Sequence, residues 1–402
     1  MRRFAWSLCL AACTTTPSSD DGGSEGTTAA GGETSTNAST STTTAATGLD
    51  ETSDSSDGTT AEPTEPNYEE RGPYGVGIQS FDVPGADDRM VRVTVWYPSD
   101  TEDGPIDLHT VVSEANAQTL QELVAAAPPE CVRSTLMGTA EAPLAEGSFP
   151  AIVFSHCLSC LGVSSSFITE RLASHGSIVI GVTHTDDTLF DQLEGTVAPL
   201  DGDWLAVRTL DASLALDGVL AMAPYDTAID QSRLGIFGHS YGATTTGKVL
   251  QDDDRFIAGV AMAAPVENPL LPGVTVDGIA EPMLMLLAQE DNSITEVGNN
   301  FMRTNAMTLS GGSWLVEVAD AGHWSFSDLC GIIEAFQPGC GEGIRQTMPG
   351  EAFTYLDADL GRQIAASYVT AFFALHLQDD AAAADYLDVG TPSDVVTVER
   401  FP

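Results

Sequence analysis

The sequence predicts an α/β fold with a mostly parallel central sheet flanked by helices. From about residue 70 onward, short apolar segments alternate with helical patterns. Several apolar segments are continuous, which is typical of parallel strands that are buried on both faces. Strand–helix alternation of this kind places helices on both sides of one sheet. We therefore expect a doubly wound α/β domain. The sequence contains no internal repeat.

The predicted elements follow one another along the chain. Residues 90–98 (MVRVTVWYP) alternate with period two and predict an antiparallel strand. Continuous apolar runs predict strands at residues 149–156, 177–184, 233–240, 256–264 and 282–289, and a last strand follows at 313–320. Helical patterns occupy residues 113–127, 163–175, 203–223, 242–251, 293–307 and 362–377. Residues 100–148 and 325–360 fit the strand and helix patterns poorly. We expect them to frame a site at the carboxyl ends of the strands.

The first 66 residues predict an export signal followed by a tether. Arg2 and Arg3 precede a short apolar run that ends in LAAC, at Cys13. LAAC resembles the lipobox of bacterial lipoproteins, which implies a signal peptide at residues 1–12 and a lipid on Cys13. The implied location is a membrane, on its periplasmic side or at the cell surface; a cleaved signal with an incidental cysteine is the alternative. Residues 13–66 are rich in Ser, Thr and Gly and predict a disordered tether, which leaves 67–402 as the folded domain.

The chain is strongly acidic, with 58 Asp and Glu against 15 Lys and Arg and a formal net charge of -43. Phosphate recognition requires clustered cations, so this charge argues against nucleic acid and anionic lipid headgroups as binding partners. We interpret the acidity as an adaptation for solubility or high salt.

Five cysteines lie in the predicted folded domain, and an exported chain permits disulfides between them. Cys330 and Cys340 bracket a ten-residue step, and we predict that they pair. Cys157 and Cys160 form a CxxC motif, which without a second ligand pair is a weak indication of a zinc or redox site. We expect Cys131 to pair with one of these two cysteines, which leaves the other as a free thiol.

The segment GIFGHSYGATT contains the strongest functional motif. Ser240 lies in a Gly-x-Ser-x-Gly sequence between a buried strand and a helical pattern, which is the context of a nucleophile elbow. The sharp turn leaves no room for side chains two residues from the serine, hence Gly238 and Gly242. The helix N-terminus that follows favours a developing anion. Ser240 is therefore the predicted nucleophile, and a tight turn without a catalytic role is the alternative.

A serine nucleophile needs a base, and the base needs an acid that fixes its tautomer. In this architecture the chain order is serine, acid, histidine. Asp291 follows the apolar run 282–289 and is the predicted acid; Glu290 is the alternative acid, and a plain helix cap is the alternative role of Asp291. Two histidines follow the acid. His376 lies within a helical pattern, whereas His323 follows a strand and a glycine and is the predicted base.

The tetrahedral intermediate of such a reaction needs two backbone N–H donors. We predict that Tyr241, directly after the nucleophile, supplies one donor. Leu158, in the loop after the strand at 149–156, supplies the other. We expect the histidines at 156, 184 and 239 to support the site through hydrogen bonds and to take no part in proton transfer.

Together these motifs resemble the α/β-hydrolase superfamily, and within it the dienelactone-hydrolase-like esterases and the platelet-activating-factor acetylhydrolases. The matching segments are FPAIVFSHCLS, ERLASHGSIVIGVTH, GIFGHSYGATT and AGHWSFSD, within residues 70–378. Cutinases and polyester hydrolases are a second resemblance, through AQEDNSIT. The chain departs from the pattern at Cys157, where the family usually has glycine. It also has alanines at Ala263 and Ala264, where the acetylhydrolases carry their acid.

We therefore predict a serine hydrolase that cleaves carboxylic esters through an acyl-enzyme and needs no metal or cofactor. The expected substrates carry short or medium acyl groups and include phospholipid-type esters and polyesters. Trp324 is expected to contact the acyl or aromatic part of the substrate, and a packing role is equally open. A serine peptidase of the same fold and a non-catalytic surface binding protein are the alternatives. The oligomeric state is left open.

Overall fold

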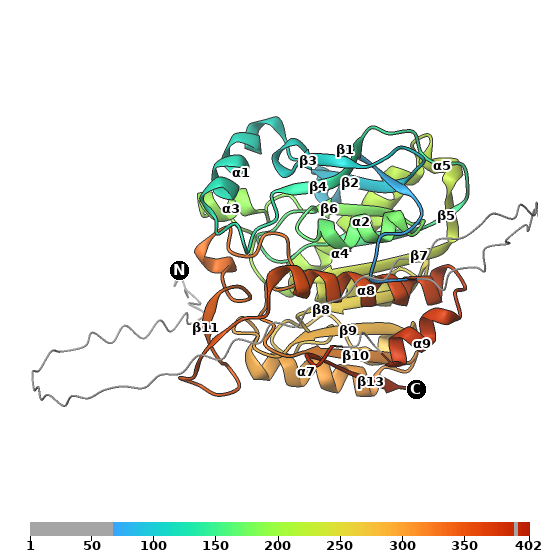
Figure 1. Ribbon diagram of the computed structural model, residues 1–402. Helices are drawn as coiled ribbons and strands as arrows, with labels where there is room; N and C mark the ends of the chain where they lie inside the picture. The colour runs from blue at the N-terminus through green and yellow to red at the C-terminus, as the bar shows by residue number, and fades with distance from the viewer. Residues whose placement is uncertain (1–66, 390–392) are drawn as a thin grey trace, which may run out of the picture. The chain divides into compact units, whose positions relative to one another are not determined.

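The computed structural model describes residues 67–389 and 393–402, so the predicted signal peptide, Cys13 and the tether lie outside the described residues. Within these ranges the chain forms an 11-stranded sheet in the order β13-β10-β9-β8-β7-β5-β6-β2-β1-β4-β3 (Figure 1). None of the helices in the described part combines the length and apolar character that a membrane span requires.

The centre of the sheet is parallel, as predicted. It contains β5 (Phe149–Ser155), β6 (Ile178–Thr183), β7 (Ile229–His239), β8 (Phe256–Met262), β9 (Met283–Ala288) and β10 (Ser313–Val318). The outer strands are β1 (Gly75–Pro84), β2 (Met90–Ser99), β3 (Gly104–Asp107) and β4 (Thr135–Ala140) at one edge, and β13 (Val396–Phe401) at the other. β2 runs antiparallel to β6, and β13 runs antiparallel to β10.

Two apolar cores explain why the parallel strands have continuous apolar sequences. In β5, Ile152 and Phe154 belong to one core, and Ala151 and Val153 belong to the other. The first core includes α2 (Ser166–Ser174), α8 (Ala358–Leu377) and α9 (Ala382–Val389), and the second includes α4 (Gly202–Leu220), α6 (Tyr241–Asp252) and α7 (Thr295–Thr308). In Figure 1, α8 crosses one face of the sheet. Alternate side chains thus point to opposite faces, and both faces are covered.

The two stretches that showed no clear strand or helix pattern contain short elements. Residues 100–148 include α1 (Glu114–Ala126), and residues 325–360 include the hairpin of β11 (Glu342–Ile344) and β12 (Ala352–Thr354). Two further short helices are α3 (Leu189–Glu194) and α5 (Tyr225–Ala228). Asp328 ties these two stretches together, because its carbonyl oxygen accepts a hydrogen bond from the Arg133 N–H at 2.9 Å.

The cysteine pairing differs from the prediction. Cys131 pairs with Cys340, Cys157 pairs with Cys160, and Cys330 is a buried free thiol. The predicted Cys330–Cys340 disulfide is therefore wrong, as is the expected pairing of Cys131 with a CxxC cysteine. The segment after Cys330 folds back over the loop at Cys131, where a Cβ on Gly331 would lie 3.1 Å from the Cys131 Cβ. This tertiary contact, and not spacing along the chain, decides the partner of Cys340.

Candidate active site

Ser240 lies in the tight turn between β7 and α6. Its backbone has φ 56° and ψ -117°, a conformation that residues with a side chain rarely adopt. A Cβ on Gly238 would lie 2.0 Å from the Gly242 carbonyl oxygen, and a Cβ on Gly242 would lie 1.9 Å from the Ser155 carbonyl oxygen. These contacts exclude any larger residue at either glycine and give the steric reason for the Gly-x-Ser-x-Gly sequence.

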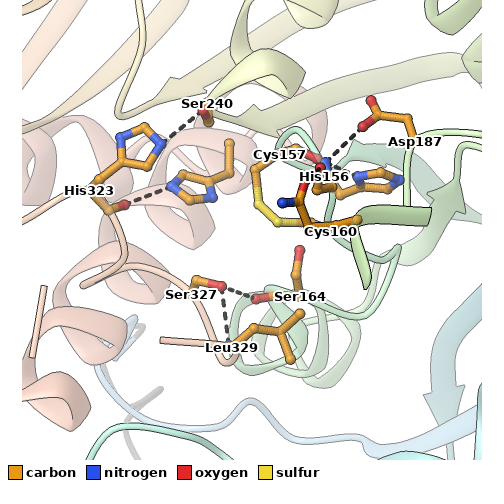
Figure 2. The surroundings of a disulfide bond; sticks show 12 residues. His156, Cys157, Cys160, Ser164, Asp187, Ser240, His323, Ser327 and Leu329 are labelled. Atoms are coloured by element: carbon orange, nitrogen blue, oxygen red, sulfur yellow. Dashed lines mark hydrogen bonds between the residues drawn. A yellow bond between two sulfur atoms is a disulfide. The ribbon is translucent and has the colours of Figure 1, made fainter. Parts of the chain in front are cut away.

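The structure brings the predicted nucleophile, base and acid into one chain of hydrogen bonds. His323 Nε2 lies 2.8 Å from Ser240 Oγ; the dashed line between these residues in Figure 2 marks this hydrogen bond. His323 Nδ1 lies 2.7 Å from Asp291 Oδ2. When Nδ1–H donates to the carboxylate, Nε2 carries a lone pair and can accept the serine proton. Asp291 is fully buried and His323 is 3% exposed, so the protein shields this chain from water.

The turn after β9 positions the acid. Asp291 Oδ1 accepts hydrogen bonds from the N–H groups of Ser293 and Ile294 at 2.8 and 3.0 Å. One carboxylate oxygen therefore holds the turn, and the other faces His323. The alternative acid, Glu290, is engaged elsewhere: its carboxylate accepts from Arg345 at 3.0 Å and from other groups of that segment. Asp291, and not Glu290, is hydrogen-bonded to His323.

Two other predicted support residues hold the backbone around the site. His239 Nε2–H donates to the His323 carbonyl oxygen at 2.8 Å, and burial, reinforced by His323, lowers the pKa of His239 to about 3. His156 Nδ1–H donates to the Cys157 carbonyl oxygen at 2.6 Å, and His156 Nε2 accepts the His184 N–H at 2.9 Å. Burial, together with nearby positive charge, lowers the pKa of His156 well below its usual value. Both imidazoles are therefore neutral hydrogen-bonding groups near pH 7.

The predicted oxyanion donors lie beside the nucleophile. Leu158 follows β5, Tyr241 begins α6, and both line the same cavity as Ser240. Among the hydrogen bonds between described residues, neither the Leu158 N–H nor the Tyr241 N–H is a donor. Both groups are therefore free to bind a ligand oxygen.

A buried arginine that the sequence analysis did not single out connects these two regions. The Arg208 guanidinium donates to the Asp187 carboxylate and to the His156 carbonyl oxygen. It also lies over the Tyr241 ring, 4.6 Å from the ring centroid. In the sequence, Arg208 is a charged residue within the helical pattern 203–223. A buried arginine requires partners, and here they are the Asp187 carboxylate after β6, the loop after β5 and the first residue of α6.

A cavity of about 320 Å³ opens beside Ser240 and His323. This volume lies at the small end of the range for ligand sites. Trp324 lines the cavity and stacks on Phe336 with ring centroids 3.8 Å apart. Other apolar side chains complete the wall, namely Leu158, Leu200, Leu271 and Ile294. Within the described residues, no cluster of three or more His, Cys, Asp or Glu side chains is arranged to hold a metal ion.

Comparison with known proteins finds partial matches to two family models. A family model described as "Platelet-activating factor acetylhydrolase, isoform II" matches residues 60–212, and one described as "Prolyl oligopeptidase family" matches residues 215–313. The platelet-activating factor acetylhydrolase of Cavia porcellus is 26% identical over 235 residues, which is 48% of this chain and 53% of that protein. The Bos taurus acetylhydrolase is 29% identical over 155 residues, or 29% of this chain and 35% of the relative. The chain therefore matches about half, or less, of the length of these relatives.

A solved structure extends the comparison to most of the fold. The ferulic acid esterase from Streptomyces cinnamoneus superposes with a TM-score of 0.60 at 22% sequence identity, over 84% of this chain and 98% of that one. These matches confirm the predicted α/β-hydrolase fold and the resemblance to the acetylhydrolases.

Proposed function

We propose that the protein is a serine hydrolase that cleaves carboxylic esters through an acyl-enzyme intermediate. The observation that carries the proposal is the hydrogen-bonded chain of Ser240, His323 and Asp291 at a mainly apolar cavity. The similarity to the acetylhydrolases supports an ester as the substrate. The shared fold is compatible with many reactions, so the site geometry is the stronger argument.

The geometry accounts for each chemical step. Ser240 Oγ attacks the ester carbonyl while His323 Nε2 accepts its proton, and Asp291 stabilises the resulting imidazolium. The N–H groups of Leu158 and Tyr241 are the proposed donors to the negative oxygen of the tetrahedral intermediate. His323 then returns the proton to the leaving alcohol. Water, activated by the same histidine, hydrolyses the acyl-enzyme and regenerates Ser240.

The cavity supports esters with a short or medium acyl group. A volume of about 320 Å³ leaves room for a few carbon atoms beyond the carbonyl, and the indole of Trp324 offers a flat apolar wall. Phospholipid-type and polyester substrates remain part of the proposal, as does membrane anchoring through a lipid on Cys13.

A peptidase is the second candidate function. The match to the prolyl oligopeptidase family favours it, because the matched residues 215–313 include Ser240 and Asp291. Hydrolysis of peptide nitroanilides, compared with nitrophenyl esters of the same acyl group, separates the two activities.

Replacement of Ser240 tests both candidates. Ser240→Ala in the full chain should lower kcat for 4-nitrophenyl acetate by about 10⁶-fold, since a catalytic serine acts as a unit with its base. Labelling by a fluorophosphonate probe should disappear as well. Ser232→Ala, at an exposed position of the same strand β7, is the matched control and should keep full activity. Unchanged ester hydrolysis by Ser240→Ala would refute the proposal.

A further inference from the structure

The disulfide between Cys157 and Cys160 lies inside the loop that carries Leu158. The two cysteines bracket Leu158 and Ser159, both sulfurs belong to buried residues, and their Cα atoms are 5.2 Å apart. Cys157 lines the same cavity as Ser240 and His323, and Figure 2 shows the disulfide beside these residues. The resemblance described in the sequence analysis implies a glycine at this position, whereas the Cys157 side chain forms a disulfide.

The backbone on both sides of Leu158 is fixed by hydrogen bonds. The Ser159 N–H donates to Asp187 Oδ1 at 2.7 Å, and the Cys160 N–H donates to the Cys157 carbonyl oxygen at 3.2 Å. Ser159 has φ 60°, so the loop reverses direction directly after Leu158. The N–H groups of Cys157 and Leu158, in contrast, donate to no described residue.

The ends of the loop are anchored to the rest of the fold. His156 is hydrogen-bonded to the His184 N–H at one end, and the Cys160 carbonyl oxygen accepts the Leu189 N–H at 3.2 Å at the other. Farther along, the Ser164 carbonyl oxygen accepts from Ser327 Oγ at 2.9 Å (Figure 2). Among the described residues Leu158 takes part in no hydrogen bond of its own. The disulfide therefore adds a covalent restraint to a turn that is otherwise held by the hydrogen bonds of the Ser159 and Cys160 N–H groups.

We propose that the Cys157–Cys160 disulfide is the positioning element for the oxyanion donor at Leu158, and that its reduction reversibly lowers turnover. The inference rests on the proposed ester hydrolase function. A dithiol reductant supplies two electrons and two protons. The sulfur–sulfur bond breaks, two cysteine thiols form, and the reductant closes its own disulfide. The freed Cys157 side chain can then rotate at the edge of the cavity, and the turn that carries Leu158 is held by hydrogen bonds alone.

The expected effect concerns turnover and not substrate binding. Loss of an oxyanion donor lowers kcat by about 10²- to 10³-fold in serine hydrolases. When the donor is present but less well aligned, the decrease in kcat should be smaller than when the donor is removed. We therefore expect kcat to fall about tenfold. The KM should stay within about twofold, because Trp324 and Phe336 lie outside the loop, although Cys157 and Leu158 also line the cavity.

The experiment compares oxidised and dithiothreitol-treated full-length protein in ester hydrolysis. Quenching in denaturant with an alkylating reagent, followed by mass spectrometry, reports which cysteines were reduced. Reoxidation with oxidised glutathione should restore kcat. Cys157→Ala/Cys160→Ala should reproduce the low kcat without any response to dithiothreitol. Cys131→Ala/Cys340→Ala, which removes only the other disulfide, should keep the full response.

Three outcomes decide between the hypotheses. If oxidised wild-type protein hydrolyses esters and both the reduced protein and Cys157→Ala/Cys160→Ala keep kcat within twofold, the inference is overturned and the proposed function stands. If kcat falls only in parallel with the melting temperature, the disulfide is merely structural and the inference is again overturned. If oxidised wild-type protein lacks esterase activity, the proposed function fails instead.

Discussion

Removal of the Cys131–Cys340 disulfide should destabilise the fold and leave the chemistry of the oxidised enzyme nearly intact. The bond joins two loops that are 209 residues apart in the sequence. Arg362, which donates to the Cys131 carbonyl oxygen at 2.9 Å, and the hydrogen bond from Arg133 to Asp328 still join the two regions when the bond is absent. We therefore expect Cys131→Ala/Cys340→Ala to fold and to keep kcat within about threefold.

The size of the effect follows from the length of the closed loop. For a loop of about 210 residues, the chain-entropy relation gives about 18 cal/mol/K, or about 5 kcal/mol at 25 °C. For the four-residue loop of Cys157 and Cys160, the same relation gives about 2 kcal/mol. A domain of roughly 330 residues has an unfolding entropy of about 0.7 kcal/mol/K at its melting temperature. The expected decreases in melting temperature are therefore about 7 °C and about 3 °C.

Thermal unfolding of the two double variants, followed by circular dichroism under oxidising conditions, measures this difference directly. Wild-type protein in dithiothreitol provides the sum of both effects. The reasoning would be refuted if Cys131→Ala/Cys340→Ala melted no lower than Cys157→Ala/Cys160→Ala. It would also be refuted if loss of the long-range bond lowered kcat as much as loss of the short-range bond.

Two further predictions concern the acid and a buried histidine. Asp291→Asn should lower kcat by about 10⁴-fold, because the amide favours the wrong tautomer of His323. Glu290→Gln should lower kcat less than about fivefold. Equal decreases of kcat in ester hydrolysis would contradict the assignment of Asp291. His239→Gln should reduce the acid sensitivity of the fold. Burial lowers the pKa of folded His239 to about 3, and the unfolded value is about 6.5. Between pH 6.5 and pH 3 the proton therefore binds the unfolded state and not the folded one. The free energy of unfolding then decreases by up to about 1.4 kcal/mol for each pH unit that the pH falls. The decrease in melting temperature from pH 6.5 to pH 4.5 should be smaller for the variant than for wild-type protein. An equal decrease in both proteins would contradict a buried neutral imidazole.

The parts of the site that sequence could predict depend on local signals. The turn at Ser240 needs glycines at fixed positions, and Asp291 and His323 each follow a strand at the same edge of the sheet. Continuous apolar sequence also identified the parallel strands, because burial on both faces leaves no polar positions. The start of α8 was available locally and was missed: Asp357 caps the N–H groups of Asp359 and Leu360, so the helix begins at Ala358 and not at residue 362.

Other features depend on contacts that no local pattern records. The partner of Cys340 is decided by how residues 325–360 fold back over Cys131, and not by the ten-residue step to Cys330. The strand β13 has an exposed, alternating sequence and is recognisable only through its pairing with β10. Arg208 occupies a helix whose sequence gives no sign that its guanidinium reaches the loop after β5. Such long-range partners require the assembled sheet.

The close approach of Gly242 to the Ser155 carbonyl oxygen has a consequence for how this scaffold can acquire new substrates. The elbow of Ser240 rests directly on the end of β5, and the next residues lead to Leu158. The turn that carries Ser240 and the loop that carries Leu158 therefore meet at the carboxyl end of β5. Leu200 and Leu271 line the cavity from other loops and do not belong to this contact between the turn and β5. Under the proposed function, exchange of such wall residues should change the accepted ester without displacing Ser240 or Leu158.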